Sequence, residues 1–211
     1  MKNNKDFGIC FILSAPSGTG KTSLLKKFFE KDTTNNIFLS ISYTTRKKRC
    51  NEIDKIHYNF VSRNMFKTMI IKKKFIEYAK IFNNYYGTSF FEINRQLKKG
   101  KDVFLDIDYN GAKQIKKKVL FSTSIFILPP SKSEVVRRLK HRNQDSHKII
   151  SKRMKKFSEE IKSYKDYDYL IVNNNFNNAL EKIRTIVNSE NLKVVYNKKK
   201  YFNLINILLK K

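Results

Sequence analysis

Residues 9–22 read ICFILSAPSGTGKT, and four apolar residues at helical spacing follow between positions 24 and 29. The five apolar residues 9–13 are typical of a buried strand, the Ser, Pro and Gly residues after them of a tight loop, and the run 23–31 of an amphipathic helix. In a strand, loop and helix of this kind, the backbone N–H groups of the loop turn inward around an anion, and the helix N-terminus adds partial positive charge. The stretch therefore predicts a phosphate-binding loop.

The loop matches the pattern G-x-x-x-x-G-K-[ST] except at its first position, where Ala15 replaces glycine. At Gly18 and Gly20 a side chain would block the anion. Lys21 would reach the β- and γ-phosphates of a nucleotide, and the Thr22 hydroxyl would face Mg²⁺. A chance Gly-Lys-Thr in a lysine-rich chain is the alternative, and the strand before the loop and the helix after it make that alternative the weaker one.

The length of 211 residues suits one ample core, or a core domain with an inserted subdomain, and 40% hydrophobic content excludes wholesale disorder. The longest apolar runs are strand-sized, far below the roughly 20 residues that a membrane span needs. The first residues, MKNNKD, do not resemble a signal peptide, so we expect a cytoplasmic enzyme. Cys10 and Cys50 lie in unlike settings without metal-type spacing, and we expect neither a disulfide nor a zinc site.

The charge balance is strongly basic, with 45 Lys and Arg against 18 Asp and Glu, a net charge of +27. Such a balance is the electrostatic footprint of a nucleic-acid-binding protein. Two other readings compete with it. Lysine and asparagine tracts such as residues 72–74 and 173–175 are what an AT-rich genome imposes on solvated faces, and the arginines gather where two nucleotides would bind. We therefore expect no dedicated nucleic-acid function.

The middle of the chain predicts a compact mixed module. Strand signals occur at 37–42, 57–61 and 75–79, with a helical stripe on Phe66, Met69 and Ile70 between the last two. Residues 83–88 predict a turn, and residues 90–99 a helix that Gly100 ends.

Buried strands of the parallel type return later, at 103–107, 124–128 and 169–172, with helices predicted at 109–118, 131–163 and 176–189. The apolar run of the first of these strands leads to Asp106, where a carboxylate would help to organise Mg²⁺ beside a phosphate-binding loop. The tail from Lys193 carries six lysines and no acid. Its apolar residues Tyr201, Leu204, Ile205, Leu208 and Leu209 stand at helical spacing, so we expect it to pack as a short helix.

Seven motifs in order resemble the guanylate kinases of the bacterial type over residues 7–192. They are SAPSGTGKT at 14–22, SYTTR at 42–46 with Arg49, FIEYA at 75–79, NYYGT at 84–88, LDID at 105–108, ILPPS at 127–131 and IVN at 171–173. The resemblance implies an α/β fold, a parallel-sheet P-loop kinase core with helices on both faces. It implies one domain over 1–211 with a core of 7–41, 101–129 and 164–192, a mixed α/β GMP-binding insertion at 42–100, a helical lid at 130–163 and a basic tail at 193–211.

The activity implied is transfer of the γ-phosphoryl group of ATP to GMP, giving ADP and GDP, with Mg²⁺. The resemblance implies ATP binding by Ala15, Pro16, Ser17, Gly18, Thr19, Gly20, Lys21 and Thr22. It implies GMP binding by Ser42, Arg46, Arg49, Tyr58, Glu77, Tyr86, Thr88 and Asp108, and a magnesium site at Thr22 and Asp106. Lys21, Arg138, Arg142 and Arg153 would be the catalytic residues, the three arginines closing with the lid over the transferring group.

The chemistry of these residue types supports the implied roles. Two arginine forks with tyrosine hydroxyls suit the oxygens of a phosphate monoester. Phosphoryl transfer needs positioning and charge neutralisation rather than a covalent nucleophile, so we assign no catalytic role to His57, His141 or His147. Arg137 has no role in the family and fits a solvated helix face.

Four positions depart from the pattern of the family. Lys48 replaces a proline, and Asn51, His141 and Asn143 replace glycines. None removes a group with an assigned role, so we expect slower or less stable activity rather than its loss.

Two alternatives stay open. A relative without catalysis could serve as a protein-interaction module, although such a module would have a broken phosphate loop and would lack the lid arginines. A basic nucleic-acid-binding ATPase would need aromatic and arginine clusters outside the nucleotide site, where this chain has mainly scattered lysine. The expected partners are ATP and GMP, with dGMP a further possible substrate and no membrane. The oligomeric state, monomer or homo-oligomer, is left open.

Overall fold

The computed structural model describes residues 7–30, 36–81, 83–119, 121–141, 147–198 and 201–210. Its core is a five-stranded parallel sheet in the order β2-β7-β1-β8-β9. The strands are β1 (Cys10–Ser14), β2 (Ile37–Ser40), β7 (Asp102–Asp106), β8 (Ser122–Leu128) and β9 (Tyr169–Val172). The apolar run of the phosphate-loop motif thus forms the central strand, and every residue of β1 is buried.

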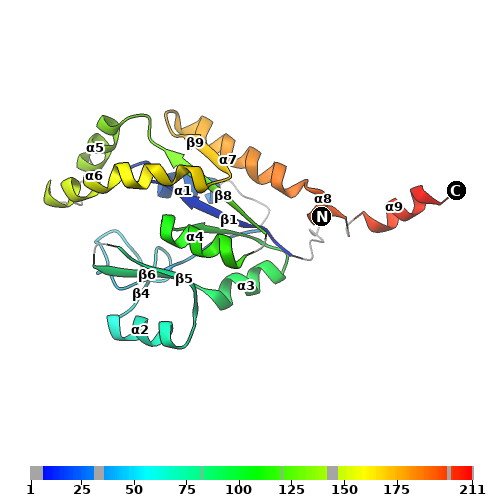
Figure 1. The fold of residues 1–211 in the computed structure, drawn as a ribbon, viewed down its shortest axis with the longest axis horizontal. Helices are drawn as coiled ribbons and strands as arrows, with labels where there is room; N and C mark the ends of the chain where they lie inside the picture. Colours follow the sequence, from blue (N-terminus) through cyan, green and yellow to red (C-terminus); the bar gives the residue numbers. More distant parts are fainter. Residues whose placement is uncertain are drawn as a thin grey trace.

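Helices cover both faces of this sheet (Figure 1). They are α1 (Lys21–Glu30) and α7 (Phe176–Asn191) on one face, and α3 (Phe90–Lys98) and α4 (Tyr109–Lys118) on the other. Successive side chains of a strand point to opposite faces, so Phe11 belongs to the core under α1 and α7, whereas Ile12 belongs to the core under α3 and α4. The predicted α/β core with helices on both faces is confirmed.

A second sheet of four strands has the order β4-β3-β6-β5. It consists of β3 (Tyr43–Thr44), β4 (Asn59–Phe60), β5 (Phe75–Ile81) and β6 (Asn84–Ser89). Helix α2 (Arg63–Ile71) packs on it through Phe66 and Met69, as the helical stripe predicted. The side chain of Ser62 caps this helix by accepting from the Met65 N–H.

The predicted turn at 83–88 is wrong. Residues 84–89 form β6, which pairs with β5 on one side and β3 on the other. The chain reverses just before it, and Asn83 has φ +69°, a backbone conformation that asparagine tolerates better than most residues. The Asn and Gly residues of this segment favour a turn locally, but backbone hydrogen bonds to β3 and β5 on its two sides stabilise a strand instead.

The lid region contains α5 (Lys132–His141), α6 (His147–Lys162) and the short 3-10 helix η1 (Ser163–Asp166). Val135 and Leu139 of α5 pack with Ile150 and Phe157 of α6 in a small core of their own. In Figure 1, α5 and α6 and the second sheet extend to the same end of the molecule, with the two helices above and the sheet below.

The C-terminal tail forms α8 (Val194–Asn197) and α9 (Phe202–Leu209). The prediction of a helix is confirmed for α9, but the prediction that it packs is wrong. Every described residue from 201 to 210 is exposed, and Figure 1 shows α9 projecting beyond the body. The helical spacing arises within the segment, whereas packing would need an apolar surface opposite it.

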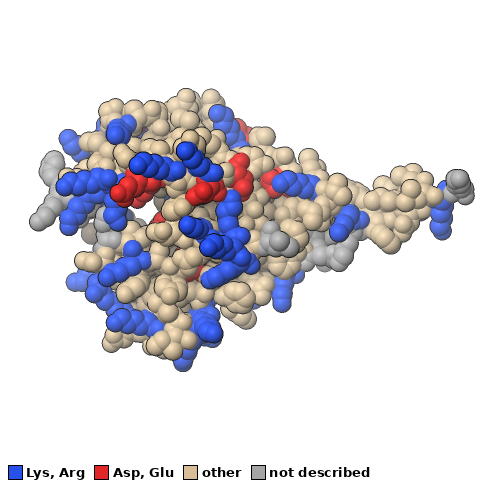
Figure 2. Space-filling model, in the orientation of Figure 1, with Lys and Arg blue, Asp and Glu red and all other residues tan. Residues whose placement is uncertain are grey.

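Basic side chains are spread over the whole face drawn in Figure 2, while acidic side chains gather near its middle. This distribution agrees with a general compositional bias on that face rather than one concentrated basic stripe. Among the described residues, no helix combines the length and the apolar character needed to cross a membrane.

Candidate active site

The phosphate-binding loop connects β1 to α1 at the carboxyl end of the central strand. Gly18 has φ +84° and Gly20 has φ +96°, conformations that favour glycine. Thr19 is buried, and its Oγ1 donates to the Pro16 carbonyl oxygen at 2.7 Å. Helix α1 begins at Lys21, two residues before the predicted start, so its N-terminal N–H groups lie at the end of the loop.

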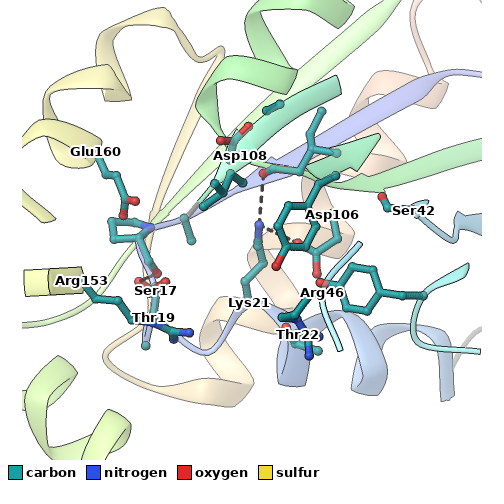
Figure 3. Close-up of a pocket in the computed structure, with 18 of the residues that line it drawn as sticks. Ser17, Thr19, Lys21, Thr22, Ser42, Arg46, Asp106, Asp108, Arg153 and Glu160 are labelled. Atoms are coloured by element: carbon teal, nitrogen blue, oxygen red, sulfur yellow. Dashed lines mark hydrogen bonds and ion pairs between the residues drawn. The ribbon is translucent and has the colours of Figure 1, made fainter. Parts of the chain in front are cut away.

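Lys21 turns toward the neighbouring strand β7. Its Nζ lies 2.5 Å from Asp106 Oδ1 and donates to the Ile107 carbonyl oxygen at 3.1 Å. Figure 3 shows this side chain in the middle of a cavity. The loop and the end of β7 therefore bring the predicted phosphate-binding lysine and the predicted magnesium-binding carboxylate into direct contact.

That cavity has a volume of about 260 Å³ and gathers most of the predicted site. Its lining comes from all three parts of the chain: the loop and β7, the second sheet, and the lid helix α6. In Figure 3, Arg153 and Glu160 lie on one side of Lys21, and Ser42 and Arg46 on the other. The predicted residues that line it are Ala15 to Thr22, Ser42, Arg46, Arg49, Tyr58, Glu77, Tyr86, Asp106, Asp108 and Arg153.

Arg46 is held in one orientation by Glu52. The guanidinium donates to both carboxylate oxygens of Glu52, at 2.9 and 2.6 Å, and the Arg49 N–H donates to the same carboxylate at 2.9 Å. The Arg46 guanidinium carbon lies 5.4 Å from the centre of the Tyr58 ring, within cation–π range. Burial alone would lower the pKa of Arg46, but its hydrogen bonds to Glu52 and Tyr86 raise it, so the group stays charged.

Glu77 lines the cavity and is only 3% exposed. Thr88 lies behind it and donates its hydroxyl hydrogen to Glu77 Oε1. Burial raises the pKa of Glu77 to about 7; the bond from Thr88 and the charge of Lys118 oppose this rise, and the charge of Asp108 adds to it. Glu77 therefore contributes a buried carboxyl group to the lining of the cavity, with one oxygen bonded to Thr88.

The side chain of Asp108 also caps helix α4, since its carboxylate accepts a hydrogen bond from the Gly111 N–H at 2.9 Å. Gly111 lies against Glu77, and a Cβ atom there would come within 2.6 Å of Glu77 Oε2. Ser42, 8% exposed, stands where β2 gives way to β3. Asp108, just after β7 of the core sheet, and Glu77, on β5 of the second sheet, thus both line the cavity.

Arg138 does not line this cavity. It lines a second pocket of about 530 Å³ on another side of the phosphate loop, with Gly18, Gly20, Asn173 and Phe176. Its Nη1 donates to the Thr19 carbonyl oxygen at 2.8 Å, and its Nε donates to Glu134 at 2.7 Å. Arg137, 70% exposed, pairs with the same glutamate, as expected for a solvated residue.

Arg153 comes from the lid helix α6 and lines the first cavity. Two turns further along α6, Glu160 accepts a hydrogen bond from the Ser17 N–H, and its burial raises the pKa of this carboxyl. Arg142 and Asn143 lie outside the described residues. His141, at the end of α5, is exposed and lines the second pocket.

Three residues of the site were missed by sequence reasoning. Glu52 and Glu160 had no motif to mark them, although Glu52 is an acid in a basic loop. Asn173 was part of a motif but had no assigned role; its Nδ2 donates to the Thr19 carbonyl oxygen at 2.7 Å. Glu160 and Asn173 bind backbone groups of the loop that are distant in the sequence, whereas Glu52 binds the nearby Arg46 side chain in a loop that no motif marks.

No group of three or more His, Cys, Asp or Glu side chains that could enclose a metal ion occurs among the described residues. Mg²⁺ bound with a nucleotide needs fewer protein ligands, since phosphate oxygens and water complete its shell. Asp106, 27% exposed at the cavity wall, has the oxygen ligands that Mg²⁺ prefers, and Thr22 is exposed on the first turn of α1. These residues fit such an ion.

Comparison with known proteins gives one family. The guanylate kinase family model matches residues 9–190. The chain is 51% identical to a guanylate kinase of Buchnera aphidicola subsp. Schizaphis graminum, covering 96% of this chain and 98% of that protein. It is 47% identical to one of Vibrio parahaemolyticus over the same shares. A crystal structure of guanylate kinase from Anaplasma phagocytophilum superposes with a TM-score of 0.77 at 32% identity, covering 91% of this chain and 90% of that one.

Proposed function

The chain belongs to the guanylate kinase family and transfers the γ-phosphoryl group of ATP to GMP, and we propose that the residues gathered around Lys21 carry out this transfer. One observation supports the proposal above all. The phosphate loop, an arginine and tyrosine cluster and a buried carboxylate all open into one cavity. A phosphate donor and a monophosphate acceptor can therefore be held side by side there, and phosphoryl transfer depends on such positioning.

ATP would place its phosphates on the loop. Residues 15–22 supply backbone N–H groups and the charge of Lys21, and the helix N-terminus adds its dipole. The second pocket adjoins the same glycines from another side, so it offers room for the nucleoside part of ATP. This division leaves the terminal phosphate at the first cavity.

GMP would lie across the second sheet with its two ends in unlike environments. The phosphate would meet Arg46, Arg49, Tyr58 and Tyr86, which combine positive charge with hydroxyl donors. The base would meet Glu77, whose ionised carboxylate can accept side by side from the ring N–H and the amino group of guanine. Ser42, Thr88 and Asp108 complete this end of the site: Thr88 orients the carboxylate, and Ser42 can bond to the O6 atom of the base.

Charge neutralisation would then lower the barrier to transfer. Family members generally use Mg-ATP; Thr22 and Asp106 would hold the Mg²⁺, and the ion would supply positive charge against the phosphates. Lys21 would leave Asp106 to contact the transferring phosphoryl group. Arg153, with Arg142 and Arg138, would complete the positive shell as the lid closes; Arg138 would have to be released from Thr19 or act through the loop.

We also propose how the chain is divided into parts and where the enzyme acts. The core would be residues 7–41, 101–129 and 164–192, the GMP-binding insertion 42–100, the lid 130–163 and the tail 193–211. We propose cytoplasmic activity on small-molecule substrates, without a dedicated nucleic-acid or membrane partner. Catalysis, rather than a scaffold role, is supported by the intact Lys21 and Arg153.

The test is a substrate panel. The protein would be incubated with ATP and Mg²⁺ and, separately, with GMP, dGMP, AMP, UMP or CMP, and ADP formation measured. We expect rapid ADP formation with GMP and a rate lower by roughly 10⁴ with AMP, because AMP would leave the buried Glu77 carboxylate unpaired. Equal rates with GMP and AMP would refute the base-reading role, and EDTA should abolish the reaction if Mg²⁺ is required.

A further inference from the structure

The carbonyl oxygen of Thr19, in the middle of the phosphate loop, is held from outside the loop by two donors. Asn173 Nδ2 donates to it at 2.7 Å, and Arg138 Nη1 donates at 2.8 Å. Asn173 is 3% exposed and Thr19 is 1% exposed. Two short bonds in a buried setting fix the direction of this carbonyl firmly.

The direction of the Thr19 carbonyl decides the direction of the Gly20 N–H. A trans peptide unit is planar, and its C=O and N–H bonds point in opposite directions. With the Thr19 oxygen turned toward Asn173 and Arg138, the Gly20 N–H must point away from them. Gly20 has φ +96°, and because glycine adopts positive and negative φ about equally readily, the residue itself does not select this orientation of the peptide.

Asn173 supplies that support from the rigid part of the fold. It follows β9 directly, and its own N–H donates to the Leu128 carbonyl oxygen at 2.8 Å, which continues the pairing of β8 with β9. Its side chain packs on Gly20 so closely that a Cβ atom at residue 20 would lie 2.8 Å from Asn173 Nδ2. Arg138, by contrast, belongs to the lid helix α5 and is bound to Glu134.

We propose that Asn173 is a positioning residue for ATP: its side-chain amide holds the Thr19–Gly20 peptide with the Gly20 N–H available to the phosphates. The inference rests on the proposed function, because it requires the phosphates of ATP in this loop. If the peptide turned over, the Thr19 oxygen would face the phosphates and repel them. Because Asn173 directly follows the core strand β9, its bond to the loop does not come from a lid residue.

The experiment measures which part of ATP is affected. Asn173→Ala removes the donor, and Asn173→Asp places a carboxylate oxygen opposite the Thr19 oxygen at nearly the same size. Dissociation constants for Mg-ATP, adenosine and GMP would be measured calorimetrically. We expect Asn173→Ala to raise the dissociation constant of Mg-ATP by about tenfold, and Asn173→Asp to raise it by more. The dissociation constants of adenosine and GMP should stay within about twofold of the wild-type values. Should Asn173→Asp fail to fold, the alanine variant carries the same test.

Asn177→Asp is the matched control, since it makes the same change at an exposed position on the first turn of α7 and should leave all three constants unchanged. Equal weakening of adenosine and Mg-ATP would overturn the inference, because Asn173 would then contact the nucleoside. Unchanged Mg-ATP binding, or an equal loss for all three ligands, would overturn it as well. A wild-type protein that does not phosphorylate GMP would instead contradict the proposed function.

Discussion

Lys21 Nζ lies 2.5 Å from Asp106 Oδ1, so the lysine of the phosphate loop is paired with the acid at the end of the neighbouring strand. The side chains are 16% and 27% exposed, and the contact is therefore partly desolvated. ATP binding must exchange this partner for phosphate oxygens. The pair holds the lysine charge at the cavity before the nucleotide arrives.

Lys21→Ala should lower kcat by at least about a hundredfold, because backbone N–H groups alone cannot match the charge of the β- and γ-phosphates. Lys27→Ala is the control, since Lys27 lies on the same helix and pairs with Glu30 at the surface. Steady-state kinetics with circular dichroism would check both variants. Near-normal turnover in a folded Lys21→Ala protein would refute the assignment of the loop.

The pH dependence of GMP use should report Glu77. Its pKa is raised to about 7 by burial, so the carboxyl carries a proton below pH 7 and presents a donor to the donors of guanine. We expect kcat/KM for GMP to rise with pH through about 7 and then level off, while Glu77→Gln loses this step and most of the activity. A profile measured from pH 5.5 to 8.5 that stays flat in the wild type would contradict this role.

The same shift has a consequence for folding. The unfolded carboxyl titrates near its ordinary value of 4.5, whereas the folded one titrates near 7, so between these values the folded state binds more protons. The contribution of Glu77 to the free energy of unfolding therefore falls as the pH rises from 4.5 to 7. Glu77→Gln should remove this part of the decline, which thermal unfolding at several pH values would measure.

Gly111→Ala should separate stability from GMP binding. Alanine in a helix is more stable than glycine by about 1 kcal/mol, but the new Cβ atom would lie 2.6 Å from Glu77 Oε2 and must displace the carboxylate. We expect the KM for GMP to rise by about tenfold or more while the KM for ATP is unchanged. Asn110→Ala, exposed on the same turn, is the control; an unaltered GMP KM in Gly111→Ala would show that Glu77 adjusts without loss.

Glu52→Gln should weaken GMP binding through Arg46. The amide keeps one acceptor and loses the charge, so the paired bonds from Arg46 to the two carboxylate oxygens cannot both form. We expect the KM for GMP to rise by about tenfold and kcat to change little. Glu181→Gln, which changes a surface pair with Arg184, is the control. A stronger affinity for GMP would mean that Glu52 competes with the phosphate instead.

Arg153→Ala should lower kcat by roughly a thousandfold and change the KM for GMP much less, since a lid arginine acts mainly on the charge of the transition state. Its neighbour Lys152 is exposed, and Lys152→Ala should behave like the wild type. Arg142→Ala should resemble Arg153→Ala. A change confined to KM would assign these arginines to substrate binding alone.

The sequence by itself determined the features that depend on neighbours along the chain. The apolar run, the glycines and the lysine of residues 9–22 predicted β1, the loop and α1, because strand burial, positive φ and helix spacing are local properties. The ordered motifs added the family and most of the residues that line the cavity. Helix spacing in the tail also predicted α9.

Only the tertiary structure decided what depends on groups distant in the sequence. The hydrogen bond from Asn173 to Thr19 joins residues 154 positions apart, and no pattern in either segment predicts it. The raised pKa of Glu77 arises from burial where β5 packs against helix α4, and β6 became a strand because β3 and β5 flank it. The apolar face of α9 could pack only against an apolar surface opposite it. Helical spacing within the tail does not reveal whether such a surface exists. Long-range packing therefore determined how the predicted residues are oriented, because the free energy of each contact depends on both partners and not on one sequence segment.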